Sequence, residues 1–383
     1  MDIPSLTQKL VSIPSYVDSN NNENAIGNFI FDYLKTNTAL IVEKQSFARG
    51  RNNVLAYTSS CKVGDKLCPA IFFVDHLDTV LPKQGWQSDQ FKAVISKDTL
   101  YGLGAADTKG NLAVLMNVAQ QLTNQRVMFL FYGDEEYSFL GMKSFIAKNR
   151  QVVLPEHIIS VDGENMTITR SCRGLVEVKI VLRGKSGHSA RSIMKDNLSI
   201  LFSDYCINLQ RELDLLTEDG LGKPSLNVAY IHLGTLKKHT KRGVVLDDAG
   251  NNIPDYLEAV LEFRTNTKST LSCIRQLMKN SALLPNIMLE IAEVRHDLQA
   301  WNGVSADVSC LSNALSDSGQ VITFTNPETA GYFDIALLAN AFGVRCECIG
   351  AIGGNRHGVN EWVNIQSLYQ LEKVLMQVVR ARS

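Results

Sequence analysis

Six side chains suited to metal binding or acid–base chemistry stand near the ends of apolar segments in this sequence. Three largely apolar runs, at 71–74, 126–132 and 157–161, each end within three residues of one of these positions. An open α/β sheet places its chemistry just beyond the carboxyl ends of its strands, so we expect these side chains to meet at one edge. The six are His76, Asp107, Glu135, Glu136, Asp162 and His357.

Two histidines and three or four carboxylates match the ligands of a pair of zinc-like ions, with one carboxylate bridging them. Two such ions about 3.5 to 4 Å apart lower the pKa of a shared water toward 7 and polarise a carbonyl oxygen. Adjacent side chains near a strand end point in different directions, so one of Glu135 and Glu136 can bind metal while the other takes the proton of the water. Asp78 is expected to hydrogen-bond the second imidazole nitrogen of His76 and fix its tautomer.

Several of these residues also have an ordinary structural interpretation. His76 fits a buried histidine of the core, Asp107 fits an N-cap of the following helix, and the run 134–136 fits a solvated acidic loop. The glycine-rich turn at 101–110 also resembles a phosphate loop, but it lacks the usual third glycine and the downstream ribose-binding acid. The placement of all six candidates near strand ends or helix starts favours the metal site.

The composition excludes several classes of partner. The 38 basic and 39 acidic residues are well mixed and leave a net charge of -1, which provides no field for nucleic acid or an anionic membrane. The first residues, MDIPSLTQKL, lack the pattern of a secretion signal, and no window of about twenty apolar residues occurs. The eight cysteines show no CxxC pair, which is typical of free thiols. We therefore expect a cytoplasmic protein that acts on a small molecule and binds metal through oxygen and nitrogen.

The 383 residues are enough for two domains. Apolar strands and amphipathic helices up to 173 and from 297 predict an α/β domain with a mixed sheet. Between them, residues 174–296 follow the order β-α-β-β-α-β, which predicts an inserted α+β, ferredoxin-like domain with a free sheet edge.

Three local predictions concern strands and loops. We expect strands 53–57 and 70–74 to be neighbours, a further strand at Val321–Thr325, and a polar surface loop at 237–252.

The candidate residues lie in four motifs, HLDTV (76–80), YGLGAADTKG (101–110), YGDEEYSFLG (132–141) and GGNRHGVNEW (353–362). These motifs closely resemble the metal motifs of M20 metallopeptidases, the group that contains acetylornithine deacetylase and succinyl-diaminopimelate desuccinylase. The resemblance spans nearly the whole chain and extends into the insert, where GKSGHSA (184–190) and NNIPDYLEAVLEFRT (251–265) look like lid motifs.

This resemblance implies a role for each candidate residue. Asp107 would bridge two ions, expected to be Zn²⁺ with Co²⁺ or Mn²⁺ as alternatives. His76 and Asp162 would complete one site, Glu136 and His357 the other, and Glu135 would be the general base. A catalytic domain of residues 1–173 and 297–383 would carry a lid and dimerisation domain at 174–296.

The resemblance also implies roles for residues of the lid. His188 would stabilise the oxyanion of the reaction. In dimeric members of the family, this histidine reaches the active site of the neighbouring subunit. Arg264, with Asn251, matches positions that hold a substrate carboxylate.

The chain departs from the family pattern at two places. Family deacylases usually have Glu-Pro where this chain reads VDGEN, so Asp162 and Glu164 compete for one ligand position. The usual spacing back from Arg173 and Gly174 falls on Asp162, and a shorter acid is also typical of aminopeptidase-like members. The lid has LGTLKKHTKRG at 233–243 in place of the family's Gly-Gly turn, which predicts unusual substrate recognition.

The resemblance predicts a metal-dependent amidohydrolase that removes an acyl group from an N-acyl amino acid and forms a homodimer through the lid. A dipeptidase or aminopeptidase with the same metals is the alternative. A further alternative is a chain that no longer binds metal and serves as a binding module. Such a chain would lack one or more of the metal ligands, whereas all of the candidate ligands are present in this sequence.

Overall fold

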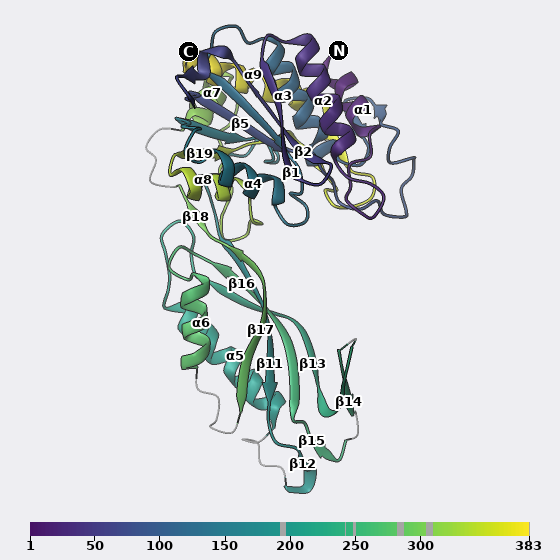
Figure 1. Ribbon diagram of the computed structural model, residues 1–383, viewed down its shortest axis with the longest axis vertical. Helices are drawn as coiled ribbons and strands as arrows, with labels where there is room; N and C mark the ends of the chain where they lie inside the picture. The colour runs from purple at the N-terminus through teal and green to yellow at the C-terminus, as the bar shows by residue number, and fades with distance from the viewer. Residues whose placement is uncertain (192–196, 242, 248–249, 282–286, 304–308, 383) are drawn as a thin grey trace. The chain divides into compact units, whose positions relative to one another are not determined.

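A mixed β-sheet with helices on both faces is the main element of the first of two units in the computed structural model (Figure 1). The structure describes residues 1–191, 197–241, 243–247, 250–281, 287–303 and 309–382. The first unit is made of Met1–Arg170, Gly303–Asn326 and Phe333–Ser383, and the second of Ser171–Asn302 and Pro327–Tyr332.

Within the described residues, the sheet of the first unit has six strands in the order β1-β2-β8-β5-β9-β19. The last four in this order run parallel to one another, whereas β1 and β2 are antiparallel to each other and β2 is antiparallel to β8. The α/β class with a mixed sheet is therefore confirmed. The strands are β1 (Ile41–Ala48), β2 (Arg51–Tyr57), β8 (Val127–Tyr132), β5 (Ile71–His76), β9 (His157–Ser160) and β19 (Arg345–Cys348).

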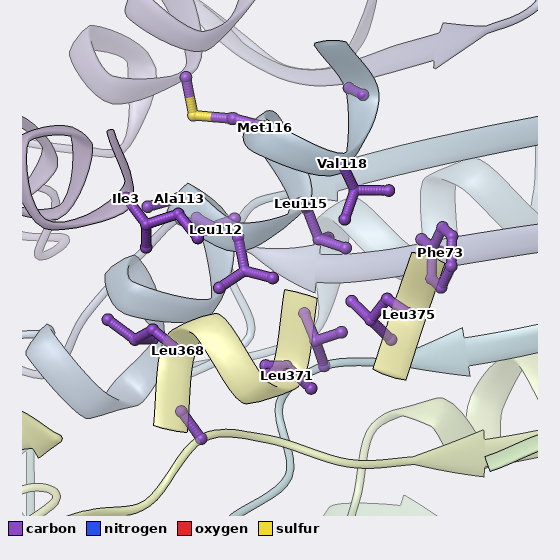
Figure 2. Packing of buried hydrophobic residues seen from close by; sticks show 14 of the residues in the cluster. Ile3, Phe73, Leu112, Ala113, Leu115, Met116, Val118, Leu368, Leu371 and Leu375 are labelled. Atoms are coloured by element: carbon purple, nitrogen blue, oxygen red, sulfur yellow. The ribbon is translucent and has the colours of Figure 1, made fainter. Parts of the chain in front are cut away.

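The alternation of side chains along β5 shows which helices lie on each face of this sheet. Phe73 joins a buried cluster with residues of α3 and α9 (Figure 2). Its neighbour Phe72 packs on the opposite face against Phe145 of α4, with ring centroids 5.5 Å apart, and Phe145 contacts Phe342 of α8. The helices of the unit are α1 (Ile3–Val11), α2 (Asn24–Asn37), α3 (Gly110–Gln120), α4 (Leu140–Asn149), α7 (Cys310–Asp317), α8 (Ile335–Phe342) and α9 (Ile365–Ala381).

Leu371 of α9 lies in the cluster between α9 and α3 and is fully buried (Figure 2). We expect Leu371→Ala to destabilise the protein by about 2 to 5 kcal/mol, because the substitution removes buried methyl groups and leaves a cavity. Tyr369→Ala, on the exposed side of the same helix, should change stability by no more than about 0.5 kcal/mol. The midpoint of thermal unfolding measures both, and equal midpoints for the two variants would contradict the packing described.

A smaller sheet and a hairpin complete the first unit. The smaller sheet has the order β20-β21-β7-β6, and the loop between β20 and β21 carries His357. Its strands are β20 (Gly353–Gly354), β21 (Trp362–Asn364), β7 (Thr99–Tyr101) and β6 (Val94–Ser96), and the hairpin pairs β3 (Lys62–Val63) with β4 (Lys66–Leu67).

The second unit holds an antiparallel sheet in the order β14-β13-β16-β11-β17. Alternate residues of β11, including Val178 and Ile180, pack with the helices α5 (Leu198–Asp214) and α6 (Leu271–Asn280). The intervening Lys179 pairs with Glu258 on the other, charged face. The elements are β10 (Ser171–Cys172), β11 (Gly174–Arg183), β12 (Gly187–His188), α5 (Leu198–Asp214), β13 (Ser225–Thr240), β14 (Gly243–Asp247), β15 (Asn252–Ile253), β16 (Tyr256–Thr265), α6 (Leu271–Asn280), β17 (Met288–Leu298) and β18 (Trp301–Asn302).

The structure corrects three predictions. Strands 53–57 and 70–74 are not neighbours, because β8 lies between β2 and β5. Val321–Thr325 forms no strand within the described residues; Phe324 makes one isolated bridge to Ile168, and Val321 is 80% exposed. Much of the loop expected at 237–252 is the hairpin of β13 and β14, while residues 242, 248 and 249 lie outside the described residues.

No helix among the described residues combines the length and the apolar character needed to cross a membrane.

Candidate metal centre

Asp107 lies between the two predicted histidines and presents one carboxylate oxygen to each. Its Oδ1 is 3.1 Å from Nε2 of His76, and its Oδ2 is 3.2 Å from Nε2 of His357. His76 is the last residue of β5, and Asp107 lies in the turn Ala105–Lys109 that precedes α3. One carboxylate therefore connects two histidines that are 281 positions apart in the sequence.

Two further carboxylates complete a group around each histidine. Oδ1 of Asp162, which follows β9, is 3.7 Å from Nε2 of His76. Oε2 of Glu136, which follows β8, is 3.1 Å from Nε2 of His357. Two of the three groups in the described residues that could each hold an ion are formed here, and Asp107 is common to both. The five residues predicted as ligands are brought together at the carboxyl edge of the sheet.

The electrostatics of these groups favour additional positive charge. Burial alone would lower the pKa of His76, but the hydrogen bonds with Asp107 and Asp162 raise it well above its usual value. Hydrogen bonds with Asp107 and Glu136 raise the pKa of His357 to about 10. Oε1 of Glu136 is buried without a hydrogen-bond partner among the described residues. Oxygen and nitrogen donors with an unsatisfied buried carboxylate oxygen fit zinc-like cations.

Glu135 lies beside these groups without belonging to either of them within the described residues. Burial, together with the negative charges of Asp162 and Glu136, raises the pKa of its carboxyl group well above the usual value, although the charge of His76 opposes this. A raised pKa makes the carboxylate a stronger proton acceptor, which suits a residue that takes a proton from water and later returns it.

Asp78 supports the centre differently from the prediction. Nδ1 of His76 contacts the backbone carbonyl of Asp78 at 3.0 Å and not its carboxylate. The carboxylate instead accepts hydrogen bonds from the backbone N–H groups of Glu135 and Glu136, both at 3.1 Å. The sequence spacing could not distinguish these arrangements, because the carbonyl and the carboxylate belong to the same residue. Asp78 thus holds the backbone from which both glutamates extend.

The ordinary interpretations of Asp107 and of the acidic run find no support in the contacts. The first turn of α3 is capped by no side chain that the structure describes, and the Asp107 carboxylate faces the histidines instead. Asp134 is buried and forms an ion pair with Arg51 at 2.7 Å, so the acidic run is not a solvated loop.

Two supporting residues were not identified from the sequence. Glu361 is buried, and its carboxylate accepts hydrogen bonds from the backbone N–H groups of Gly104, Ala106 and Asp107 at 2.7 to 2.9 Å. Nη1 of Arg356 lies 3.6 Å from Oδ1 of Asp162. Both belong to the motif GGNRHGVNEW, so the signal was present, but the motif does not show which backbone its charged residues contact.

The structure separates the two acids that compete for one ligand position. Asp162 lies in the group with His76 and Asp107, whereas Glu164 is exposed. We expect Asp162→Asn to weaken the binding of one zinc ion by more than about tenfold, since even residues that only support ligands contribute that much. Glu164→Gln should leave both affinities unchanged. Isothermal titration with zinc measures this, and the reverse pattern would assign the ligand to Glu164.

The three predicted residues of the insert lie in the second unit. His188 is exposed, pairs with Asn252 between β12 and β15, and lies near Asn251, whose carbonyl accepts a hydrogen bond from Ser189. Arg264 lies near the other end of β16, where its Nε is 3.0 Å from Glu262. Asn251 precedes β15 and Arg264 is the second-last residue of β16, so the two lie toward opposite ends of β16 within one chain.

The chain is similar to known proteins over most of its length. The model of peptidase family M20/M25/M40 matches residues 72–381. A succinyl-diaminopimelate desuccinylase of Helicobacter pylori (strain P12) is 25% identical over an alignment of 414 positions, gaps included, that covers 100% of this chain and 100% of that protein. A succinyl-diaminopimelate desuccinylase of Legionella pneumophila (strain Paris) is 26% identical, over an alignment that covers 82% of this chain and 84% of that protein.

Solved structures show the same fold. Aminopeptidase PepT from Bacillus cereus superposes with a TM-score of 0.76 at 16% identity, covering 99% of this chain and 98% of that chain. The YXEP protein of Bacillus subtilis, described as a dinuclear metal binding peptidase from the M20 family, gives a TM-score of 0.66 at 16% identity, covering 98% and 96%.

Proposed function

The chain belongs to peptidase family M20/M25/M40 and is a metallohydrolase of that family, and from this premise we propose that it hydrolyses the amide bond of an N-acyl amino acid. The observation that carries the proposal is the position of Asp107, whose two carboxylate oxygens each face one histidine. A carboxylate shared by two ligand groups would hold a pair of ions close together, as two-metal hydrolases do. The proposed ligands of two Zn²⁺ ions are His76, Asp107, Glu136, Asp162 and His357.

Two bound divalent cations would polarise the carbonyl of the substrate and make a nearby water more acidic. Glu135 accepts the proton of the attacking water and returns it to the nitrogen of the leaving amine. Asp78 fixes the backbone of Glu135 and Glu136, and Glu361 fixes that of Asp107. These buried contacts hold the acid–base group and the ligands in place before substrate arrives.

The acyl amino acid substrate is supported by the full-length similarity to succinyl-diaminopimelate desuccinylases. We propose an N-succinyl or N-acetyl amino acid, with Arg264 binding its carboxylate. In this proposal, residues 174–296 are a lid and dimerisation domain.

The second unit supports a homodimer. β16 has ten residues between Tyr256 and Thr265, and a strand of that length spans about 30 Å. One small substrate cannot contact both Arg264 and the pair of His188 and Asn251 of the same chain across that length. We propose that the partner subunit supplies His188 for the oxyanion and Asn251 for the substrate carboxylate.

A dipeptidase or aminopeptidase is the second candidate. The observation that favours it is that an aspartate, Asp162, lies in the ligand group with His76, and a shorter acid at this position is typical of the aminopeptidase-like members that the sequence resembles. The proposed metal chemistry would be the same, and the two candidates differ in the groups on either side of the amide.

Hydrolysis of a mixed panel of N-succinyl and N-acetyl amino acids and dipeptides, with and without a chelator, tests the proposal. We expect release of succinate or acetate that a chelator abolishes and added zinc restores. Cleavage of dipeptides alone would move the protein to the peptidase class. Hydrolysis that a chelator does not affect would overturn the metal mechanism.

A further inference from the structure

A second cluster of reactive side chains lies at the opposite edge of the main sheet from the metal centre. His157 is the first residue of β9 and Glu347 lies in β19, whereas the metal ligands follow the carboxyl ends of the strands. Cys310 begins α7, and Arg382 follows α9. His157, Cys310 and Glu347 are all buried.

The side chains form a relay from the thiol to a carboxylate. Sγ of Cys310 is 3.6 Å from Nδ1 of His157. Nε2 of His157 is 3.1 Å from Oε2 of Glu347, which is an ion-pair contact without the angle of a hydrogen bond. The same carboxylate oxygen accepts a hydrogen bond from the backbone N–H of Cys310 at 3.0 Å. This order of thiol, imidazole and carboxylate is the arrangement that activates a cysteine nucleophile.

Two further groups place positive charge next to the sulfur of Cys310. Nη2 of Arg382 donates a hydrogen bond to Sγ of Cys310 at 3.1 Å. Cys310 is also the first residue of α7, after the capping residue Ser309, so the sulfur lies near the positive end of a helix dipole. Cations and helix N-termini both stabilise a thiolate over a thiol.

The geometry fits an activated thiolate better than a third metal site. Sγ of Cys310, one ring nitrogen of His157 and one carboxylate oxygen of Glu347 lie within 4.8 Å of one another, so their spacing alone would also allow a metal ion. The guanidinium of Arg382, 3.1 Å from the sulfur, decides between the two, because a fixed positive charge repels a cation and stabilises a thiolate.

A pocket of about 160 Å³ gives a small reagent access to the thiol. Cys310 and Arg382 line it, together with Asn313, Asp317 and Gln377. The pocket has room for a molecule of a few atoms and is too small for a peptide.

We propose that Cys310 is a site of reversible oxidation, at which hydrogen peroxide converts the thiolate to a sulfenic acid. The sulfur attacks one peroxide oxygen, so that an S–O bond forms as the O–O bond breaks. Sulfur is oxidised and peroxide is reduced, and the departing hydroxide takes the proton held by His157 and leaves as water. A small thiol then returns the sulfenic acid to the reduced form through a disulfide.

The acidities of the groups agree with this proposal. Burial alone would raise the pKa of Cys310, but His157 and Arg382 lower it below the usual value. Burial opposes the charged form of His157, yet the contacts with Cys310 and Glu347 raise its pKa to about 9. By contrast, burial raises the pKa of the Cys206 thiol to about 11.

The test measures peroxide oxidation and iodoacetamide alkylation of each cysteine in the folded, full-length protein by mass spectrometry. We expect Cys310 to react at least about tenfold faster than Cys68 or Cys273 at pH 7, since only the thiolate reacts. Between pH 6 and 8, where an ordinary thiol gains about tenfold in rate per pH unit, the rate at Cys310 should rise less. The charged groups that face Cys310 are His157, Glu347, Arg382 and Asp317.

Two variants separate the relay from simple exposure. Arg382→Gln should slow the reaction of Cys310 several-fold and steepen its pH profile, and His157→Gln should do so more strongly. Arg380→Gln removes the same charge from an exposed position in the last turn of α9, two residues earlier, and should have no effect. Equal rates in Arg382→Gln, His157→Gln and the parent, or a Cys310 no faster than Cys68, would overturn the proposal. If the parent bound a third zinc ion and Cys310→Ser did not, the proposal would be overturned in favour of a metal site.

Discussion

Glu135→Gln should lower the rate of amide hydrolysis by about 10²- to 10⁴-fold while two metal ions stay bound, since this is the usual contribution of a general base. Glutamine keeps the size of the side chain and removes its ability to accept a proton. Glu135 lies outside both ligand groups within the described residues, so metal affinity should not change. Steady-state kinetics and metal analysis of the same preparation measure the two effects.

Glu136→Gln is the matched comparison for this variant. The two glutamates are adjacent, and both receive a backbone contact from Asp78, but only Glu136 contacts His357. We expect Glu136→Gln to lose metal as well as activity. Turnover of Glu135→Gln within about tenfold of the parent would place the base elsewhere, and loss of metal from it would make Glu135 a ligand.

Local patterns predicted the elements near the centre well because each carries its own signal. The apolar run before His76 is β5, which is buried along its whole length, as expected for an interior strand of a parallel region. The order of the strands carries no such local signal. β8 lies between β2 and β5 although it comes later in the chain, because pairing depends on how the connecting helices pack.

The incorrect predictions share a physical cause. Val321–Thr325 has the composition of a strand, but a strand requires partners for its backbone groups, and only an isolated bridge at Phe324 is present within the described residues. The polar stretch at 237–252 was interpreted as a loop, yet polarity reports exposure, and an exposed hairpin of β13 and β14 is equally polar. Backbone contacts such as those of Asp78 and Glu361 depend on folding, which the spacing of side chains does not encode.

Asp107→Asn should remove both metal ions and reduce activity to that of the chelated protein. Each carboxylate oxygen of Asp107 faces a different histidine, and an amide can present only one oxygen. The other atom becomes an N–H₂ group, which donates hydrogen bonds and cannot bind a cation. The carboxylate of Asp162 contacts His76, and it has no such contact with His357. Asp162→Asn should therefore lose one ion, whereas Asp107→Asn should lose two.

Metal content after dialysis against zinc, expressed per chain, distinguishes the two variants. Zinc should raise the unfolding midpoint of the parent, because an ion that binds only the folded state stabilises it, and this shift should vanish in Asp107→Asn. An unchanged circular dichroism spectrum excludes a general loss of fold. If Asp107→Asn kept one ion at full occupancy, the carboxylate of Asp107 in the parent would serve a single site. The proposal that Asp107 bridges two ions, on which the proposed hydrolysis depends, would then be wrong.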